Sequence, residues 1–464
     1  MRLSPISRTI AAAAAGTTLL VPMQAFASGF ALLEQSANRL GNAFAGTTVV
    51  TEDATAMFFN PAALSKLDRA QVAISASGVK ISSEFRNRNS QAAFGQPLGT
   101  SGGDAGDWNA VPSAYFATPI TDRLAFGFGF NVPFGLKLEY PDDWIGRFQA
   151  LNSEIKTYNF NPAISWELND VVTLGVGVNY QRLQAELTNA VNYTGIVAEG
   201  LPGLAQLGVI SPSDIPALIA ANAGLQGHAR VRGDDGAWGF NVGILFQLTP
   251  DTRLGLSYRS KVDYDVEGSI RFDPPTAAEP NGALIIGAVS APGGPFSNSR
   301  ASVDLELPDI ATASLSHRIG DRWEILADVA WTGWSSVQEL RIVREAGEDL
   351  PTPELWDDTW RVALGATYRL NPAVKLRAGV AFDETPVPDR TRTPRLPDPD
   401  RTWVAFGVRW EASEAFVIDA GYAHLFSDDV PLNQSQDNVA AFGLLNGMQE
   451  SSVDIVGVQA AFKF

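Results

Sequence analysis

The sequence predicts an all-β fold, in which fourteen antiparallel strands close into a transmembrane β-barrel around an N-terminal plug, or hatch. Three observations predict this fold. Most of the chain alternates apolar residues with small or polar ones, the connections are alternately short and long, and a Gly- and Ala-rich segment separates an export signal from the first strand. A closed barrel suits a membrane because it leaves no unpaired backbone groups in the hydrocarbon.

Residues 1–27 form the predicted secretory signal peptide. Two arginines give it a positive start, residues 10–21 form an apolar run, and Ala25-Phe26-Ala27 provides the small residues of a cleavage site. The mature chain is expected to begin at Ser28. The apolar run is too short to span a bilayer, and no later window reaches about 18 apolar residues, so no transmembrane helix is expected.

Residues 28–64 are the predicted hatch, and residues 65–464 are the predicted barrel. The hatch segment is rich in Gly and Ala, carries few charges and is too short to bury a core of its own. Gly29, Gly41 and Gly46 permit close backbone approach. The segment therefore needs a surrounding wall, which the barrel supplies.

The strands are predicted from a period of two. In residues 124–130, leucine and phenylalanine alternate with alanine and glycine, and residues 172–181 and 238–248 alternate in the same way. A soluble sandwich also alternates, but its large residues point into a core and its outer face is charged. Here the opposite face carries glycine, asparagine and glutamine, as in a barrel with apolar residues toward lipid and polar residues toward the lumen.

Six tight turns and seven long loops give the strand count of fourteen. The long loops lie near residues 87–107, 135–153, 188–229, 272–300, 344–355, 386–400 and 427–449. An even count places both termini on the side of the tight turns, which is the periplasmic side. The last strand alternates up to Phe464, and such a terminal aromatic resembles the outer-membrane assembly signal of bacterial barrels. We therefore expect a multi-pass barrel in the outer membrane of a Gram-negative bacterium, inserted by the barrel assembly machinery.

Composition excludes several functions. The chain has no cysteine, which rules out disulfides and every cysteine-based metal or nucleophile site. A formal net charge of −17 argues against a nucleic-acid partner, because phosphate binding needs clusters of Lys and Arg. His228, His317 and His424 are scattered without metal-ligand spacing, so no metal or cofactor is expected and the chain is not predicted to be an enzyme.

Short motifs spread over the mature chain carry a family resemblance. They are Ser28-Gly29-Phe30, Leu40-Gly41-Asn42-Ala43, Asn60-Pro61-Ala62, Trp331-Thr332-Gly333-Trp334-Ser335, Pro386-Val387-Pro388 and Leu396-Pro397-Asp398-Pro399-Asp400-Arg401. In this order they resemble the FadL-type family of outer-membrane transporters for long-chain fatty acids and other hydrophobic molecules. The resemblance implies a fourteen-stranded barrel closed by an N-terminal hatch. It also implies capture of an apolar ligand in the extracellular loops, transfer to a pocket in the barrel, and lateral release through a gap in the wall.

The resemblance places this gap where the third strand is kinked beside the hatch. Here the third strand runs into Asn131 and Pro133, and Pro133 lacks the N–H that a strand ladder needs. The other interpretation of Pro133 is simply the end of the strand. The family's Asn-Pro-Ala maps onto Asn60, Pro61 and Ala62. Asn60 could satisfy backbone groups freed by a broken ladder, or it could form a turn before proline.

Ligand-binding candidates come first from the extracellular loops. Leu204, Leu218 and Ile219 belong to apolar stretches of the longest loop, where Ser213 is the candidate cap of a helix that continues to Leu225. Exposed apolar surface on an extracellular face usually marks binding. The alternative is that the two loops near 188–229 and 272–300 pack on each other as a lid, and the two interpretations are compatible.

Further candidates come from the lumen and the hatch. Strand parity points Arg259 and Lys261 toward the lumen, where either could pair with a ligand carboxylate. The alternative is that lumenal charges pair with each other or with the plug, because a bare charge in a narrow barrel is costly. Phe30 is expected to contact the ligand from the hatch, or to serve only in plug packing.

The predicted function is passive uptake of hydrophobic compounds, with long-chain fatty acids as the leading substrate class. Uptake of aromatic or aliphatic hydrocarbons is the alternative, because both need the same apolar groove and only a cation near the head group differs. A polar porin is disfavoured by the plug, and an adhesin or a barrel hydrolase is the rival from another class. The expected partners are the hydrophobic ligand, outer-membrane lipid and lipopolysaccharide, and closure within one chain predicts a monomer.

Overall fold

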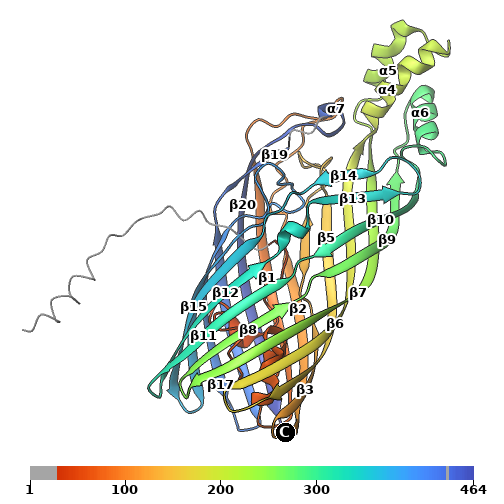
Figure 1. The fold of residues 1–464 in the computed structure, drawn as a ribbon. Coiled ribbons are helices and arrows are strands. Elements are labelled where there is room, and N and C mark those ends of the chain that lie inside the picture. Colours follow the sequence, from red (N-terminus) through yellow and green to blue (C-terminus); the bar gives the residue numbers. More distant parts are fainter. Residues whose placement is uncertain (1–28, 435–437) are drawn as a thin grey trace, which may run out of the picture.

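The computed structural model describes residues 29–434 and 438–464, so the predicted signal peptide lies outside the described residues. Twenty strand segments form one antiparallel sheet, and together they make a closed barrel of fourteen strands (Figure 1). The barrel closes because β20 (Leu445–Lys463) pairs along the whole of β1 (Gln71–Asn87). The predicted all-β antiparallel barrel and its strand count of fourteen are confirmed.

Eight barrel strands are continuous. Besides β1 and β20 they are β2 (Trp108–Thr121), β5 (Asn152–Glu167), β6 (Val172–Asn192), β7 (Gln226–Thr249), β16 (Val374–Asp383) and β17 (Arg401–Glu411). The hairpin of β6 and β7 is the longest, since its pairing runs up to Asn192 opposite Gln226. The loop predicted near 188–229 is therefore shorter than expected, because its ends continue the strands.

Six barrel strands are interrupted, and each consists of two segments. They are β3 with β4 (Leu124–Asn131, Gly135–Glu139), β8 with β9 (Thr252–Arg259, Val262–Asp273), β11 with β10 (Ile310–Ile319, Ser299–Leu307), β12 with β13 (Trp323–Thr332, Glu339–Arg344), β15 with β14 (Thr359–Asn371, Leu350–Pro353) and β18 with β19 (Phe416–Ser427, Val430–Gln434). Each break can change which side chains point inward, because one irregular residue exchanges the inward and outward positions along the strand segment that follows it.

The two faces of the wall differ as the alternation predicts. Large apolar side chains such as Phe128, which is 41% exposed, and Trp238, which is 68% exposed, point outward. The inner face carries small and polar residues, among them the buried Asn159 and Asn179. This polarity is the one expected of a barrel whose outer surface faces lipid.

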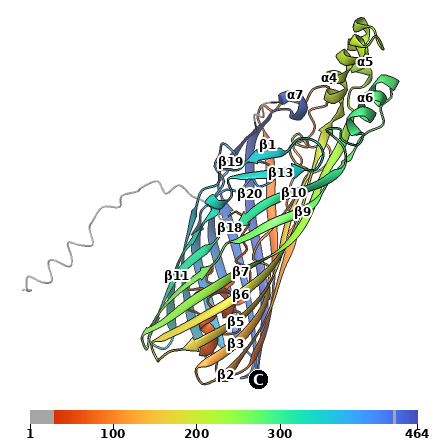
Figure 2. The same ribbon diagram turned by 45° about the vertical axis from the view of Figure 1, so that its right-hand side comes forward.

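Short helices lie at one end of the barrel, opposite the end at which the C-terminus lies (Figures 1 and 2). They are α4 (Tyr193–Gln206), η2 (Pro212–Asp214), α5 (Ile215–Ala221), α6 (Pro280–Ser290) and α7 (Val439–Phe442). Ser213 lies inside η2 and does not cap α5, and Leu225 lies beyond its end, so both details of the predicted loop helix were wrong. Among the described residues, no helix combines the length and the apolar character needed to cross a membrane.

Residues 29–67 lie inside the barrel and are called the inner segment below (Figure 1). The inner segment contains α2 (Ala37–Leu40), α3 (Ala56–Phe59) and η1 (Pro61–Lys66), nearly all of whose residues are buried. Its backbone approaches the wall closely, since a Cβ on Gly41 would lie 2.6 Å from the Cα of Gly407 in β17. Small residues on both sides are therefore required for this packing.

Candidate functional site

The barrel wall is interrupted beside the inner segment. β2 pairs with β3 only as far as Ala114 opposite Phe130, and β4 pairs with β5 but not with β2. Residues 108–113 of β2 therefore have a strand partner on the β1 side alone. The interruption coincides with Val132-Pro133-Phe134, where Pro133 has no N–H to offer a ladder.

The inner segment takes over the hydrogen bonds that the interrupted strand has lost. The N–H of Leu32 donates to the carbonyl of Pro133 at 2.8 Å, and the N–H of Gly135 donates to the carbonyl of Phe30 at 3.0 Å. The side chain of Gln35 accepts from the N–H of Val132 at 3.0 Å and donates to its carbonyl at 2.6 Å. The strand therefore bends inward onto residues 30–35 and is satisfied there, as buried backbone groups must be.

The structure places the predicted gate residues in two groups. Asn131 is the last residue of β3 and accepts a hydrogen bond from Asn159 at 3.0 Å, and Pro133 lies at the bend itself. Asn60 lies elsewhere, because its side chain accepts from the N–H of Ala62 at 2.9 Å and donates to the carbonyls of Thr48 and Ile244. It caps η1, with Pro61 at the first position, and the groups freed at the bend are bonded by Gln35 instead.

An apolar cavity, called the first cavity, lies in the lumen toward the end of the barrel that carries the loop helices; counted together with its opening to solvent, its empty space is about 1000 Å³. Its wall comes from β4, β5, β6, β7, β9, β10 and β13, and Phe30 of the inner segment also lines it. The apolar residues that line it include Leu136, Ile155, Leu183, Leu187, Val231, Val266, Val303, Leu305, Val337, Leu340, Ile342 and Leu396. Its lining is that of a site for a hydrophobic small molecule.

Two further cavities lie around the start of the inner segment. The second cavity shares Phe30 and Leu136 with the first and extends toward β1 and β20. The third cavity extends from Ala31 and Leu32 past Pro133 to Arg259. Residues 29–33 therefore lie where the upper lumen, the wall interruption and the middle of the barrel come together.

Phe30 is the centre of an aromatic cluster at this junction. Its ring centroid lies 5.1 Å from that of Trp334, 5.9 Å from that of Phe134 and 6.0 Å from that of Trp356. Such tilted and edge-to-face contacts stabilise the packing of aromatic side chains beyond their burial alone. Phe30 thus packs against the wall from the inner segment and borders two cavities, and its predicted contact with a ligand stays a prediction.

The two predicted lumenal cations have different positions. Arg259 points inward, donates to Asn179 at 2.7 Å and to the carbonyl of Phe58 at 2.8 Å, and lies over the Phe58 ring. Lys261 points outward: its side chain is 51% exposed and pairs with Glu306 at 2.6 Å, so its predicted lumenal direction was wrong. The break between β8 and β9 explains the error, because it shifts the alternation and turns the following even-numbered residues inward.

The predicted loop residues lie in a small core above the barrel. Leu204, Leu218 and Ile219 pack partly buried around Tyr193 and around Ile285 of α6. The two long loops thus pack on each other, which is the arrangement of the lid interpretation. None of the three residues borders the first cavity, although exposed apolar side chains such as Leu207, 78% exposed, lie close to them in sequence.

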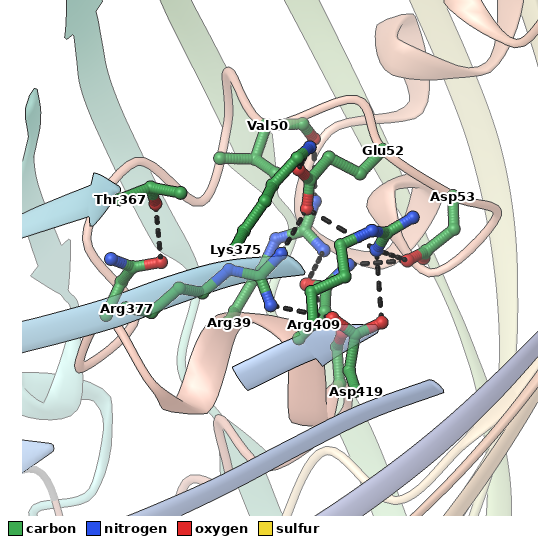
Figure 3. A network of polar contacts seen from close by, with 12 residues as sticks. Arg39, Val50, Glu52, Asp53, Thr367, Lys375, Arg377, Arg409 and Asp419 are labelled. Atoms are coloured by element: carbon green, nitrogen blue, oxygen red, sulfur yellow. Dashed lines mark hydrogen bonds and ion pairs between the residues drawn. The ribbon is translucent and has the colours of Figure 1, made fainter. Parts of the chain in front are cut away.

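A buried ionic network fastens the inner segment to the wall (Figure 3). Glu52 of the inner segment pairs with Lys375 at 2.6 Å and with Arg377, both on β16. Asp419 of β18 pairs with Arg377 at 2.6 Å and with Arg409 at 3.0 Å. These lumenal charges are paired with each other and with the inner segment, as expected of charges in a narrow barrel.

Two charged residues of the first cavity escaped sequence reasoning. Glu354 precedes β15, and Arg395 lies in the loop between β16 and β17; both side chains border the cavity. Burial raises the pKa of Glu354 to about 7, although the indole N–H of Trp356 donates to its carboxylate at 3.0 Å. Burial also lowers the pKa of Arg395 to about 10. Neither residue belongs to an alternating strand, so parity gave no signal for them.

Comparison with known proteins agrees with this architecture. The family model described as "Outer membrane protein transport protein (OMPP1/FadL/TodX)" matches residues 18–464. The long-chain fatty acid transport protein of Escherichia coli O6:H1 is 29% identical, over 91% of this chain and 92% of the relative. Outer membrane protein P1 of Haemophilus influenzae is 30% identical, over 88% of each chain.

Solved structures show the same fold. A FadL homologue of Pseudomonas aeruginosa superposes with a TM-score of 0.81 at 26% identity, covering 94% of this chain and all of that one. The toluene transporter TodX of Pseudomonas putida is similar in fold, with a TM-score of 0.67 at 19% identity, covering 93% of this chain and 99% of that one. The family comprises transport proteins of the outer membrane and not enzymes. The chain, an outer-membrane β-barrel, therefore belongs to the OMPP1/FadL/TodX family of outer-membrane transport proteins.

Proposed function

We propose that the protein takes up hydrophobic compounds across the outer membrane by passive diffusion, with long-chain fatty acids as its main substrates. The observation that carries the proposal is the first cavity, whose lining inside the barrel is almost wholly apolar. An acyl chain removed from water gains about 0.8 kcal/mol for each buried methylene group. The names of the relatives, a long-chain fatty acid transport protein among them, support the same substrate class.

The proposed route has three stages. Exposed apolar residues of the loops around α4, α5 and α6, including those near Leu204, Leu218 and Ile219, first collect the ligand from the medium. The ligand then occupies the first cavity above Phe30. Movement of residues 29–35, the start of the proposed hatch, opens the way to the interruption between β2 and β4, where the ligand leaves sideways into the membrane.

Uptake of neutral hydrocarbons is the second candidate. The extent of apolar lining in the first cavity favours it, because a hydrocarbon needs no polar partner there. A hydrocarbon would leave the charges of Arg395 and Glu354 inside the cavity without a new partner, which costs free energy. A carboxylate ligand would pair with the positive charge of Arg395, and we therefore propose fatty acids as the main substrates.

We also propose that the barrel acts as a monomer, since its sheet closes within one chain. Its outward apolar face would lie against outer-membrane lipid, and the end that carries the loop helices against lipopolysaccharide. Insertion by the barrel assembly machinery would use the last strand, which ends in the exposed Phe464. No polar porin pathway is proposed, because the inner segment occupies the lumen.

Binding to the purified, detergent-folded protein tests the proposal. Radiolabelled oleate should bind saturably, and Ala185→Phe, which fills part of the first cavity from β6, should weaken binding. Ala420→Phe is the matched control, because Ala420 alternates with the inward Asp419 and faces outward on β18. Saturable binding of toluene but not of oleate would favour the hydrocarbon alternative. A steady open current through single protein molecules in a planar bilayer would contradict a plugged barrel.

A further inference from the structure

The first cavity contains very little charge. Among its described lining residues, only Arg232, Glu354 and Arg395 are ionisable. Arg232 is committed elsewhere: its guanidinium donates to Glu186 at 2.8 Å, and 60% of its side chain is exposed. Two charged groups therefore remain for the cavity, a carboxylate and a guanidinium.

Arg395 is held weakly and only by neutral oxygens. Its guanidinium donates to the carbonyls of Asn152 and Thr188 and to the hydroxyl of Ser153, each at 3.4 Å, and to the amide oxygen of Asn189 at 3.3 Å. These contacts are longer than the usual 2.9–3.0 Å. Over residues 29–434 and 438–464, no salt bridge joins Arg395 to a carboxylate. A half-buried guanidinium at the edge of an apolar cavity, bonded only to neutral oxygens, favours an anionic partner.

Glu354 supplies the opposite charge on another wall of the same cavity. The indole N–H of Trp356 donates to its carboxylate at 3.0 Å, and the hydroxyl of Thr391 fixes its carbonyl at 2.6 Å. Trp356 itself packs on Phe30, so Glu354 is tied to the aromatic cluster beneath the cavity. Glu354 lies within the field of Arg395 but makes no direct ion pair with it.

We infer that Arg395 binds the carboxylate of the ligand, and that Glu354 is a resident anion that competes with this carboxylate for the positive charge. The inference rests on the proposed function, because it assigns the recognition of the head group within the same cavity. The guanidinium offers a planar pair of N–H donors to a carboxylate. The acyl chain would then extend over Leu183 and Leu305 toward Phe30.

The side chains hydrogen-bonded to Arg395 and Glu354 support these two roles, because none of them is charged. The side chains that approach Arg395 from β5 and β6 are uncharged, namely Ser153 and Asn189. Those that approach Glu354 are Trp356 and Thr391, also uncharged. Within the loop of Arg395, the cation of Arg392 is already paired with Asp389. Head-group recognition therefore depends on Arg395 and Glu354, with the outward-directed Arg232 as the remaining charge.

The test compares oleate with oleyl alcohol, which has the same chain and no charge. Arg395→Gln should weaken oleate binding about tenfold or more, the range of charge-assisted hydrogen bonds, and should leave oleyl alcohol within about twofold. Arg395→Lys should restore part of the loss. Arg390→Gln, at an exposed arginine of the same loop, is the matched control and should change neither affinity. Glu354→Gln should strengthen oleate binding and leave oleyl alcohol unchanged.

The outcomes separate the two proposals. If both ligands bind saturably and Arg395→Gln weakens both equally or neither, the assignment of Arg395 is overturned while the uptake function stands. If neither ligand binds to the natural sequence, the proposed function fails, and the head-group assignment fails with it. Heat-modifiable migration of each variant on a gel verifies that the barrel has folded, so that loss of binding reports on the cavity.

Discussion

The side chain of Gln35 holds both backbone groups of Val132, accepting from its N–H at 3.0 Å and donating to its carbonyl at 2.6 Å. One glutamine thus replaces a neighbouring strand at the point where the wall is interrupted. The relationship couples the start of the inner segment to the bend of the third strand. Any movement of residues 30–35 must therefore free the backbone at the bend or carry it along.

Gln35→Ala should loosen this coupling. Both groups of Val132 would lose their partner, at a cost of about 1–3 kcal/mol for each buried group left unsatisfied. We expect faster amide hydrogen exchange in residues 29–35 and 132–135, measured by mass spectrometry on the folded barrel. Gln206→Ala, at an exposed position of α4, is the control. Unchanged exchange at the bend in Gln35→Ala would show that the bend holds without the inner segment.

Gly41→Ala should disturb the fit of the inner segment. Its φ of −63° suits any residue, so the effect would be steric: the new Cβ would lie 2.6 Å from the Cα of Gly407. Backbone on both sides would have to move apart, and we expect the lumen to leak small solutes. Liposome swelling measures this leak. Gly287→Ala, where a Cβ in α6 would meet nothing within 4 Å, should not leak. Equal permeability of both variants would mean that the inner segment adapts to the extra methyl group.

Asp419→Ala tests the ionic network. It would remove the carboxylate shared by Arg377 and Arg409, which are 5% and 1% exposed, and breaking a buried pair in this way costs about 3–5 kcal/mol. The urea midpoint of unfolding in lipid vesicles should fall accordingly. Asp251→Ala breaks an exposed pair with Arg318 and should cost about 1 kcal/mol or less. Similar midpoints for the two variants would argue that the other paired carboxylates, Glu52, Asp53 and Glu411, balance the two arginines without Asp419.

The sequence was informative wherever a period of two continued without a break. The outward phenylalanines of β3 and the inward Asp419 and Arg377 follow directly from alternation. Lys261 was wrongly predicted to point inward because the break between β8 and β9 exchanges the inward and outward positions. Alternation alone does not predict such a break.

The rest of the site depends on contacts between distant parts of the chain. Gln35 meets Val132 97 residues away, and Glu52 meets Arg377 325 residues away, so no local pattern links them. Arg395 lies in a loop without periodicity, where only the folded chain shows that it borders an apolar cavity. The family resemblance suggested the bend at Pro133, but only the structure shows which groups bond to the backbone there.

Ligand binding should depend on pH through Glu354. Because its pKa is raised to about 7, this carboxyl is mostly neutral at pH 6 and mostly charged at pH 8. Arg395, with its pKa lowered only to about 10, stays charged over the whole interval. An anionic ligand near Arg395 thus meets a second negative charge at pH 8 but not at pH 6, and must bind more tightly at pH 6.

Dodecyl sulfonate is the suitable probe, because it remains ionised and its own titration does not contribute. If the bound anion raises the pKa of Glu354 by one unit, linkage makes binding about fivefold weaker at pH 8 than at pH 6. Calorimetric titration below the micellar concentration measures the ratio. Dodecanol should bind with the same affinity at pH 6 and at pH 8. The Glu354→Gln variant should likewise bind dodecyl sulfonate with the same affinity at both pH values. A pH dependence that survives in Glu354→Gln would assign the effect to another group, and a flat profile in the natural sequence would place the bound anion beyond the field of Glu354.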